Sequence, residues 1–547
     1  MLFTLHRYIF REVFRVFLLA VIALTLIMSL GSILRPVQEY GVGPRQVLHL
    51  MGYFLPITLT FVLPIAALFA AALVYGRFAA DNELDACKAS GISLTTLFYP
   101  GLVLAIMVAI ANLVLSFHVM PAFVHRAEKS LKADAKQILF RNIQRRSYYE
   151  LPGDQQYRIY ADQADLENNI LSGVVVTELK ANTIKRIITA AKASVKFNPH
   201  DIFNEVQITA YDTYQMTDDG QEGFSAQRLS LTTEFGSLLG DNIKFKKIDE
   251  MKKIQADPMR FYPVAKLARE AYVQFTAELL AEDINTKINA RPQGTNNYPA
   301  QPVDTSKFYK LYSDQETVMF TAGQCLAADS RKIRLLDEVI VVESDIVTDR
   351  PLRTLRSAEA LLHITGDELA PTLTMEILNA TWQTGSSTGG LTGRHVIRGL
   401  VLPDTVADKF TSQNAMEAVS PASVATGLNA PPSANLKALQ KRLQTQIAKT
   451  FHQIKAEIHS RLVFGIGCIP MILIGIAAGI ILKGGHLLSA FGASSVPAGL
   501  LIVCIMTGKN VTKNPGSQGV SGTMIMWAAL VVLCVLAVVM YRRLLKN

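Results

Sequence analysis

Few residue patterns in this 547-residue chain match catalytic motifs. The run Gly385-Ser-Ser-Thr-Gly389 fits the G-x-S-x-G pattern of serine hydrolases, with Ser387 as nucleophile. That motif needs a sharp strand-to-helix turn, whereas this run is a flexible series of Gly, Ser and Thr. The sequence contains no phosphate-binding loop, zinc-protease motif or paired-cysteine metal site. We therefore predict no catalytic residue, no metal site and no cofactor, and another chain must supply the energy for any work.

The segment 76–93 contains the most informative polar residues. Its sequence is Gly-Arg-Phe-Ala-Ala-Asp-Asn-Glu-Leu-Asp-Ala-Cys-Lys-Ala-Ser-Gly-Ile-Ser. Asp81 or Asn82 can cap a short helix, and Gly91 is suited to its end. An acidic residue such as Glu83 is favourable in a first helical turn. A short helix here could receive a partner protein, and an ordinary solvated loop is the alternative.

Six long apolar runs lie along the chain, three before and three after a long polar block. The segment 76–93 lies between the second run and the third. An apolar helix of about 20 residues crosses a hydrocarbon core of about 30 Å. Six such runs argue against core helices of a soluble protein, and the first is too long for a cleaved signal peptide. The sequence predicts an integral membrane protein with three spans on each side of the block. The predicted spans are residues 16–34, 54–75, 101–119, 462–482, 487–508 and 519–541.

Basic residues near the ends of the spans set the expected orientation. Arg7 and Arg15 precede the first span, and Arg542 and Arg543 follow the last. With an even number of spans, we expect both termini in the cytoplasm and residues 120–460 outside it. The net charge of +9 then reflects membrane orientation rather than nucleic-acid binding, because the basic residues form no single stripe interleaved with aromatic residues.

The polar block contains short strands rich in β-branched residues, separated by turn formers. Examples are residues 174–177, 206–209 and 339–342. This pattern predicts an antiparallel β-sandwich or jelly roll. Cys325 is the only cysteine of the block, so no disulfide can form within it and burial of apolar side chains must stabilise it.

The block also contains an internal repeat. Residues 186–193 resemble residues 353–360, and residues 206–209 resemble residues 373–376. Both pairs are displaced by 167 positions, which is 353 minus 186. Chance similarity between two β stretches is the alternative. Because order and spacing both hold, we predict a duplicated jelly-roll-like β unit.

These features define the expected domain organisation. A Tyr-x-Leu tripeptide, at Tyr149 and Tyr309, opens each β unit. Two linkers, at 290–304 and 414–435, are rich in Pro, Asn, Ala or Ser and are expected to be exposed and mobile. A helical stalk at 436–460 is expected to run directly into the fourth span. The predicted segments are 1–120 (spans one to three), 121–246 (first β unit), 247–305 (helical insertion and linker), 306–413 (second β unit), 414–460 (linker and stalk) and 461–547 (spans four to six).

Several short motifs in the membrane half resemble one known family. They are Tyr75-Gly-Arg77, Asp81-Asn-Glu-Leu84, Ala89-Ser-Gly-Ile-Ser93, Pro100 at the start of the third span, Val119-Met-Pro121 at its end, and Glu457-Ile-His-Ser-Arg461 before the fourth span with Pro470. Together they resemble the LptF/LptG family of lipopolysaccharide export permeases, over roughly residues 1–215 and 436–547. The resemblance implies an α-helical membrane protein with three spans, a periplasmic β-jelly-roll domain and three further spans.

The resemblance also implies a function. Members are permease subunits of an ABC exporter that extracts lipopolysaccharide or a related glycolipid from the bacterial inner membrane and passes it to periplasmic β-jelly-roll bridge proteins. A separate cytoplasmic ABC ATPase would bind segment 76–93, with Glu83 as the main contact and Arg77 and Asp85 as neighbours. The subunit would pair with a homologous permease subunit or with a second copy of itself.

Basic residues at the outer rim are candidates for binding lipid phosphate. Arg35 lies at the outer end of the first span, where its guanidinium can meet a phosphate while its stem stays in apolar surroundings. The family also uses basic residues near this depth, and Arg45, Arg126 and Lys129 are further candidates. Interaction with ordinary phospholipid headgroups is the alternative for all four.

The length of the chain departs from the family, whose typical members have one periplasmic β unit. A second unit could prolong a lipid-conducting groove or replace a separate bridge protein. The sequence does not decide between an LptF-like and an LptG-like identity. Two other function classes stay open: a mechanotransmitting ABC membrane subunit that carries no lipid, and a membrane-anchored periplasmic scaffold without an ATPase.

Overall fold

The computed structural model divides into two compact units. The first is Met1–Asp257 with Ala448–Asn547, and the second is Pro258–Ile447. The residues described are 2–40, 44–133, 135–150, 156–180, 183–199, 204–217, 224–235, 242–289, 308–313, 316–327, 332–346, 350–367, 370–384, 387–403, 406, 415–482, 487–514 and 519–546.

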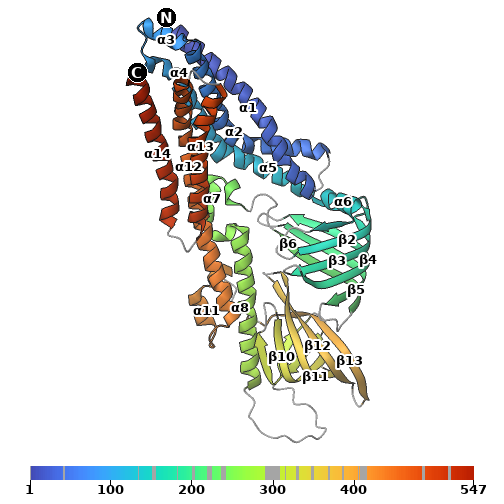
Figure 1. Cartoon of the computed structure of the whole chain (residues 1–547). Coiled ribbons are helices and arrows are strands. Elements are labelled where there is room, and N and C mark those ends of the chain that lie inside the picture. The colour runs from blue at the N-terminus through green and yellow to red at the C-terminus, as the bar shows by residue number, and fades with distance from the viewer. Residues whose placement is uncertain are drawn as a thin grey trace. The chain divides into compact units, whose positions relative to one another are not determined.

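Six of the described helices are long and apolar enough to cross a membrane, in the predicted three-plus-three arrangement (Figure 1). The third continues from α4 through a π-helical turn into α5. The candidate spans are Phe3–Gly31, Gly52–Ala80, Leu94–Lys129, Ala434–Ile481, Phe491–Lys513 and Gly522–Leu545. The helices are α1 (Leu2–Tyr40), α2 (Pro44–Ala80), α4 (Leu94–Val114), the π turn (Leu115–Val119), α5 (Met120–Ala133), α12 (Ala434–Ile481), α13 (Leu487–Lys513) and α14 (Gly519–Lys546).

Small residues allow two of these helices to approach closely. In a bilayer the lipid is as apolar as the helix surface, so association relies on close packing at small residues. Gly475 and Gly479 form a G-x-x-x-G pair on one face of α12. A Cβ atom on Gly479 would lie 2.5 Å from the carbonyl oxygen of Ala72, and one on Gly475 would lie 3.0 Å from that of Leu68. The backbones of α2 and α12 are therefore in direct contact.

Buried polar groups join α2 to α4. The Tyr75 hydroxyl donates to the carbonyl oxygen of Leu97 at 3.0 Å and accepts from the amide of Gly101 at 3.2 Å. The Asn112 amide donates to the carbonyl oxygen of Thr60 at 2.6 Å. Because an unpaired polar group is costly in an apolar environment, these bonds fix how the two helices pack.

A six-stranded antiparallel sheet follows the first three spans. Consecutive strands are neighbours, so the sheet is a meander. Leu139, Phe140 and Ile143 of α6 (Ala135–Arg146) are buried in its core. The strands are β1 (Tyr148–Glu150), β2 (Gln156–Asp165), β3 (Ile170–Lys180), β4 (Thr183–Pro199), β5 (Asn204–Thr217) and β6 (Phe224–Phe235).

The second unit contains another antiparallel sheet, ordered β13-β12-β11-β10-β8-β7, with β9 paired to β10. Phe275, Leu280 and Ile284 of α8 (Tyr262–Asn289) belong to its core. The Asn285 side chain bonds both backbone groups of Cys325, at 2.8 and 3.1 Å. The strands are β7 (Tyr309–Tyr312), β8 (Glu316–Thr321), β9 (Gln324–Ala327), β10 (Lys332–Asp345), β11 (Pro351–Asp367), β12 (Ala370–Thr384) and β13 (Ser387–Val401).

The strand register confirms the duplication. In the first sheet the paired residues run Tyr149, Ile159, Val176, Ile188 and Gln215, strand by strand. In the second sheet they run Tyr309, Phe320, Val341, Leu355 and Trp382. Strands β1 to β5 thus correspond to β7, β8, β10, β11 and β12. From β4 onward the displacement is the predicted 167, since Ile188 corresponds to Leu355.

The connecting segments agree in part with the predictions from the sequence. The expected helical insertion is present as α7 (Ile248–Ala256) and α8, and the stalk is part of the continuous 48-residue α12. The stretch 414–435 was expected to be an exposed linker, and many of its described residues are exposed, but it also forms two short helices with buried apolar side chains. It contains α10 (Ala415–Ala418) and α11 (Pro421–Gly427), because its few apolar side chains, such as Val424, enter the core of the second unit. The other predicted linker, 290–304, lies outside the described residues.

Candidate functional site

A short helix, α3 (Glu83–Ala89), lies between α2 and α4 at the predicted place. Glu83 occupies its first turn and is exposed. The residue before it, Asn82, has φ 58°, and its side chain makes no capping hydrogen bond, so the predicted side-chain cap is not formed. The C-terminal end is as expected: Gly91 has φ 83°, and the Ile92 amide donates to the carbonyl oxygen of Cys87 at 3.1 Å.

Leu84 and the half-buried Cys87 attach one side of α3 to the membrane helices. Leu84 is the only buried residue of α3 and belongs to a cluster that includes Phe78 of α2 and Leu97 of α4. The acidic residues Glu83 and Asp85 remain exposed. The helix is therefore held from one side and presents charge on the other. This is a geometry suited to binding a protein partner.

The other two coupling candidates make local ion pairs. An Nη2 atom of Arg77 lies 3.5 Å from a carboxylate oxygen of Glu12 in α1, and its guanidinium lies 5.6 Å from the centre of the Phe78 ring. Arg77 thus joins α1 to α2. Asp85 pairs with Lys88 at 3.9 Å within α3. The structure places Glu83 and Asp85 together and Arg77 at the end of the preceding helix.

The structure describes the side chains of only two of the four rim candidates. Arg126 and Lys129 lie on α5 and are exposed, with the Arg126 guanidinium 5.4 Å from the centre of the Phe123 ring. The side chains of Arg35 and Arg45 lie outside the described residues. The same holds for the Ser387 side chain, although this residue begins β13 directly after β12. A position at the start of a strand differs from the strand-to-helix turn that holds the nucleophile of a hydrolase.

The comparison with known families decides what kind of protein carries this site. The model of the family described as "Lipopolysaccharide export system permease LptF/LptG" matches residues 7–279 and 315–543. The chain belongs to the LptF/LptG family. It is therefore a multi-pass permease subunit of lipopolysaccharide export rather than an enzyme. A comparison with curated proteins found no match.

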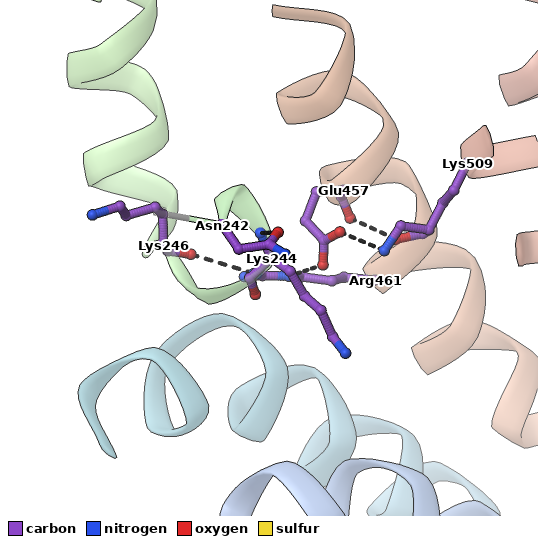
Figure 2. Close-up of polar contacts among 7 residues, drawn as sticks. Asn242, Lys244, Lys246, Glu457, Arg461 and Lys509 are labelled. Atoms are coloured by element: carbon purple, nitrogen blue, oxygen red, sulfur yellow. Dashed lines mark hydrogen bonds and ion pairs between the residues drawn. The ribbon is translucent and has the colours of Figure 1, made fainter. Parts of the chain in front are cut away.

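A partly buried polar cluster in the first unit was not assigned by the sequence. We define the cationic cluster as Lys244, Glu457, Arg461, Lys509 and Lys513. Glu457 and Arg461 lie one helical turn apart on α12, and Lys509 and Lys513 lie on α13. Lys244 lies in a 3₁₀ turn (Ile243–Phe245) between the first sheet and α7. Figure 2 shows these elements meeting around the Glu457 carboxylate.

Glu457 and Arg461 organise the cluster. The Arg461 Nε donates to a carboxylate oxygen of Glu457 at 3.2 Å, and the Lys509 ammonium pairs with the other oxygen at 2.5 Å. The Arg461 Nη2 donates to the carbonyl oxygens of Lys244 at 2.7 Å and Lys246 at 3.3 Å. These bonds attach the turn after the first sheet to the base of a membrane helix.

The four-residue spacing of Glu457 and Arg461 could have indicated part of this cluster from the sequence. Residues four apart on a helix share a face, and a charged pair on a helix that continues into an apolar span implies a buried or interfacial role. The contribution of Lys244 had no such signal, because it lies more than 200 positions away in the chain and only the folded structure brings it near.

Proposed function

We propose that this LptF/LptG-family chain is the membrane subunit of an ABC exporter in which α3 receives a separate cytoplasmic ATPase. The observation that carries the proposal is the attachment of one side of α3 through Leu84 and the half-buried Cys87, while Glu83 and Asp85 remain exposed. A partner that moves α3 would move α2 and α4 with it, since Leu84 belongs to the same buried cluster as residues of both helices. The proposed substrate is lipopolysaccharide or a related glycolipid, which the β units would receive. The subunit would work beside a homologous permease or a second copy of itself, and would pass the glycolipid on to bridge proteins.

Charge reversal on α3 tests the ATPase contact. We expect the Glu83→Lys variant to lose co-purification of the ATPase, because it replaces an exposed anion in the contact with a cation. The matched control is Glu167→Lys, the same charge change at an exposed position in the connection between β2 and β3. Equal recovery of ATPase with Glu83→Lys and with the control would contradict the assignment.

A second experiment separates lipid transport from force transmission alone. A photo-crosslinking amino acid replaces Ala193, which is buried in the core of the first sheet. We expect crosslinks to lipopolysaccharide that depend on ATP hydrolysis by the partner. An active complex without such crosslinks would favour the mechanotransmitting subunit that carries no lipid. Neutralising Arg126 and Lys129 together should reduce the crosslinks if these rim cations hold lipid phosphate.

A further inference from the structure

The cationic cluster holds more positive charge than its carboxylate can balance. The charges of Lys509, Lys513 and Arg461 all act on Lys244, and that of Lys509 acts on Lys513, with Glu457 as the nearby anion. The carboxylate is already engaged by Arg461 and Lys509. Lys244 has no carboxylate partner among the described residues. Arg461 is buried and the three lysines are half-buried, and gathering several partly desolvated cations around one anion is unfavourable unless another negative group completes the site.

Arg461 has an unused donor inside the cluster. Its side chain is 3% exposed, and its Nη1 atom is buried without a hydrogen-bond partner among the described residues. The Nε and Nη2 atoms are fully engaged by Glu457 and two backbone carbonyls, which fix the guanidinium plane. The face of the guanidinium lies 5.6 Å from the centre of the Phe117 ring. A fixed, partly unsatisfied guanidinium is well suited to bind an oxyanion.

Lys244 supplies a second free cation. Figure 2 shows its side chain pointing away from the Glu457 carboxylate, while the Lys246 side chain points out of the cluster. The Lys244 ammonium lies 5.8 Å from the centre of the Phe61 ring of α2 and 5.6 Å from that of Phe245. Burial lowers the pKa of Lys244 below the ordinary 10.5, and the positive charge of Lys509 lowers it further. A bound anion would relieve both effects.

The location of the cluster fits a lipid headgroup. Lys513 is the last residue of the candidate span Phe491–Lys513, and Arg461 lies where α12 becomes apolar. The charged groups therefore gather at the ends of membrane helices, beside the turn that leaves the first sheet. Phosphoryl groups of membrane lipids lie at this depth.

We propose that the cationic cluster binds a phosphoryl group, with Arg461 Nη1 and Lys244 Nζ as the principal donors and Lys509 nearby. The inference rests on the proposed function and extends it: a phosphorylated glycolipid would pass this site between the membrane helices and the first β unit. The site is separate from the rim candidates Arg126 and Lys129.

The test uses the full chain in nanodiscs of phosphatidylcholine that contain lipid A or its dephosphorylated form. Retained glycolipid is measured by mass spectrometry across a titration. We expect Lys244→Gln to weaken binding of lipid A by about tenfold or more, the usual loss for a charge-assisted hydrogen bond. Lys252→Gln, the same change at an exposed position on α7, should bind as the unchanged chain does. Lys244→Arg should restore binding, and dephosphorylated lipid A should not distinguish the variants.

Further arms identify the source of the phosphoryl group and protect the test against misfolding. The Lys244 side chain makes no hydrogen bond or ion pair among those described, so Lys244→Gln should fold; Arg461→Gln provides the second variant. Competition by inorganic phosphate at millimolar levels would identify a free-anion site, whereas competition only by phosphatidylglycerol would identify a lipid site. Equal binding of lipid A by Lys244→Gln, Arg461→Gln and Lys252→Gln would overturn the phosphoryl site alone. Absence of lipid A binding to the unchanged chain, together with absence of a co-purifying ATPase, would overturn the proposed function instead.

Discussion

Two buried carboxylates occupy equivalent places in the two sheets. Glu178 of β3 lies opposite Arg186 and pairs with it at 2.7 Å. Glu343 of β10 lies opposite Arg353, forms an ion pair with it, and also accepts a hydrogen bond from His395 at 2.7 Å. Burial alone would raise the pKa of Glu343, but the hydrogen bonds from His395 and Arg353 outweigh it and lower the pKa. The same cross-strand pair therefore stabilises both copies.

Replacing the buried carboxylate tests its contribution. We expect Glu343→Gln to reduce the free energy of unfolding of the second unit by about 1–3 kcal/mol, because it loses charge-assisted hydrogen bonds. The pKa of Glu343 is lower in the folded than in the unfolded chain. Its contribution is therefore present above the ordinary pKa of 4.5 and is lost as pH falls through the folded pKa. The free energy of unfolding of the Glu343→Gln variant should therefore not show this decrease at acid pH. Urea unfolding followed by Trp382 fluorescence, with Trp527 replaced by Phe, measures it.

The control is an exposed pair in the same sheet. Arg334 and Glu359 lie 2.8 Å apart and are both substantially exposed. Glu359→Gln should cost at most about 1 kcal/mol, since solvent screens such pairs. A loss equal to that of Glu343→Gln would show that burial of the Glu343 carboxylate adds nothing.

At the scale of elements, the contact between α2 and α12 depends on the absence of a side chain. A Cβ atom on Gly479 would approach the Ala72 carbonyl oxygen to 2.5 Å, which forces the backbones apart. We expect Gly479→Ala to cost about 1–3 kcal/mol, as other overpacked sites do. The measurement is the thermal midpoint in detergent, followed by size-exclusion chromatography of the surviving protein.

Gly492→Ala on α13 is the matched control. Among the described residues, and apart from its chain neighbours and the backbone of its own helix, no heavy atom lies within 4 Å of the position that its Cβ would take. The change should be neutral or slightly stabilising, because alanine favours a helix over glycine. If both variants shift the midpoint equally, close packing is not what Gly479 provides.

The elements that the sequence predicts well are those whose signals are local or evenly spaced. The six spans follow from runs of apolar residues, α3 from acidic residues near Gly91, and the duplication from the shared displacement of 167 positions. The order of the strands within each sheet was not predicted, because alternation of apolar and polar residues does not reveal which strands pair. The burial of Val424 was missed since a few apolar residues in an Ala/Ser/Pro stretch decide it.

In the candidate site too, features set by the local sequence were predictable and features set by the tertiary fold were not. The place of Glu83 in the first turn of α3 was predictable from the local sequence, whereas the ion pair between Arg77 and Glu12 depends on how two helices pack. The cationic cluster joins Lys244 to Arg461 across 217 positions. No local pattern reports such a contact, because only the tertiary fold determines which distant segments meet.

At the scale of the whole molecule, orientation in the membrane is the main untested prediction. We expect the termini and α3 in the cytoplasm and both sheets in the periplasm, because basic residues flank the cytoplasmic ends of spans. In a variant without the natural cysteines, Ser90→Cys and Lys310→Cys introduce one exposed thiol each. A membrane-impermeant maleimide applied to cells with a permeabilised outer membrane should label Lys310→Cys. It should label Ser90→Cys only after the inner membrane is opened. The reverse pattern would invert the topology.

The register of the two sheets shows where the chain tolerates changes in length. Ile159 and Phe320 are displaced by 161 positions, Val176 and Val341 by 165, and Ile188 and Leu355 by 167. Most of the difference thus falls in connections between strands, one residue is added within β10 at its register shift between Leu336 and Val339, and the β4–β5 ladder has kept one length in both copies. The connections before β3 and β4 are consequently the natural places to graft an epitope or a fluorescent reporter. A single residue added within β4 or β5 would turn its inward side chains to the opposite face.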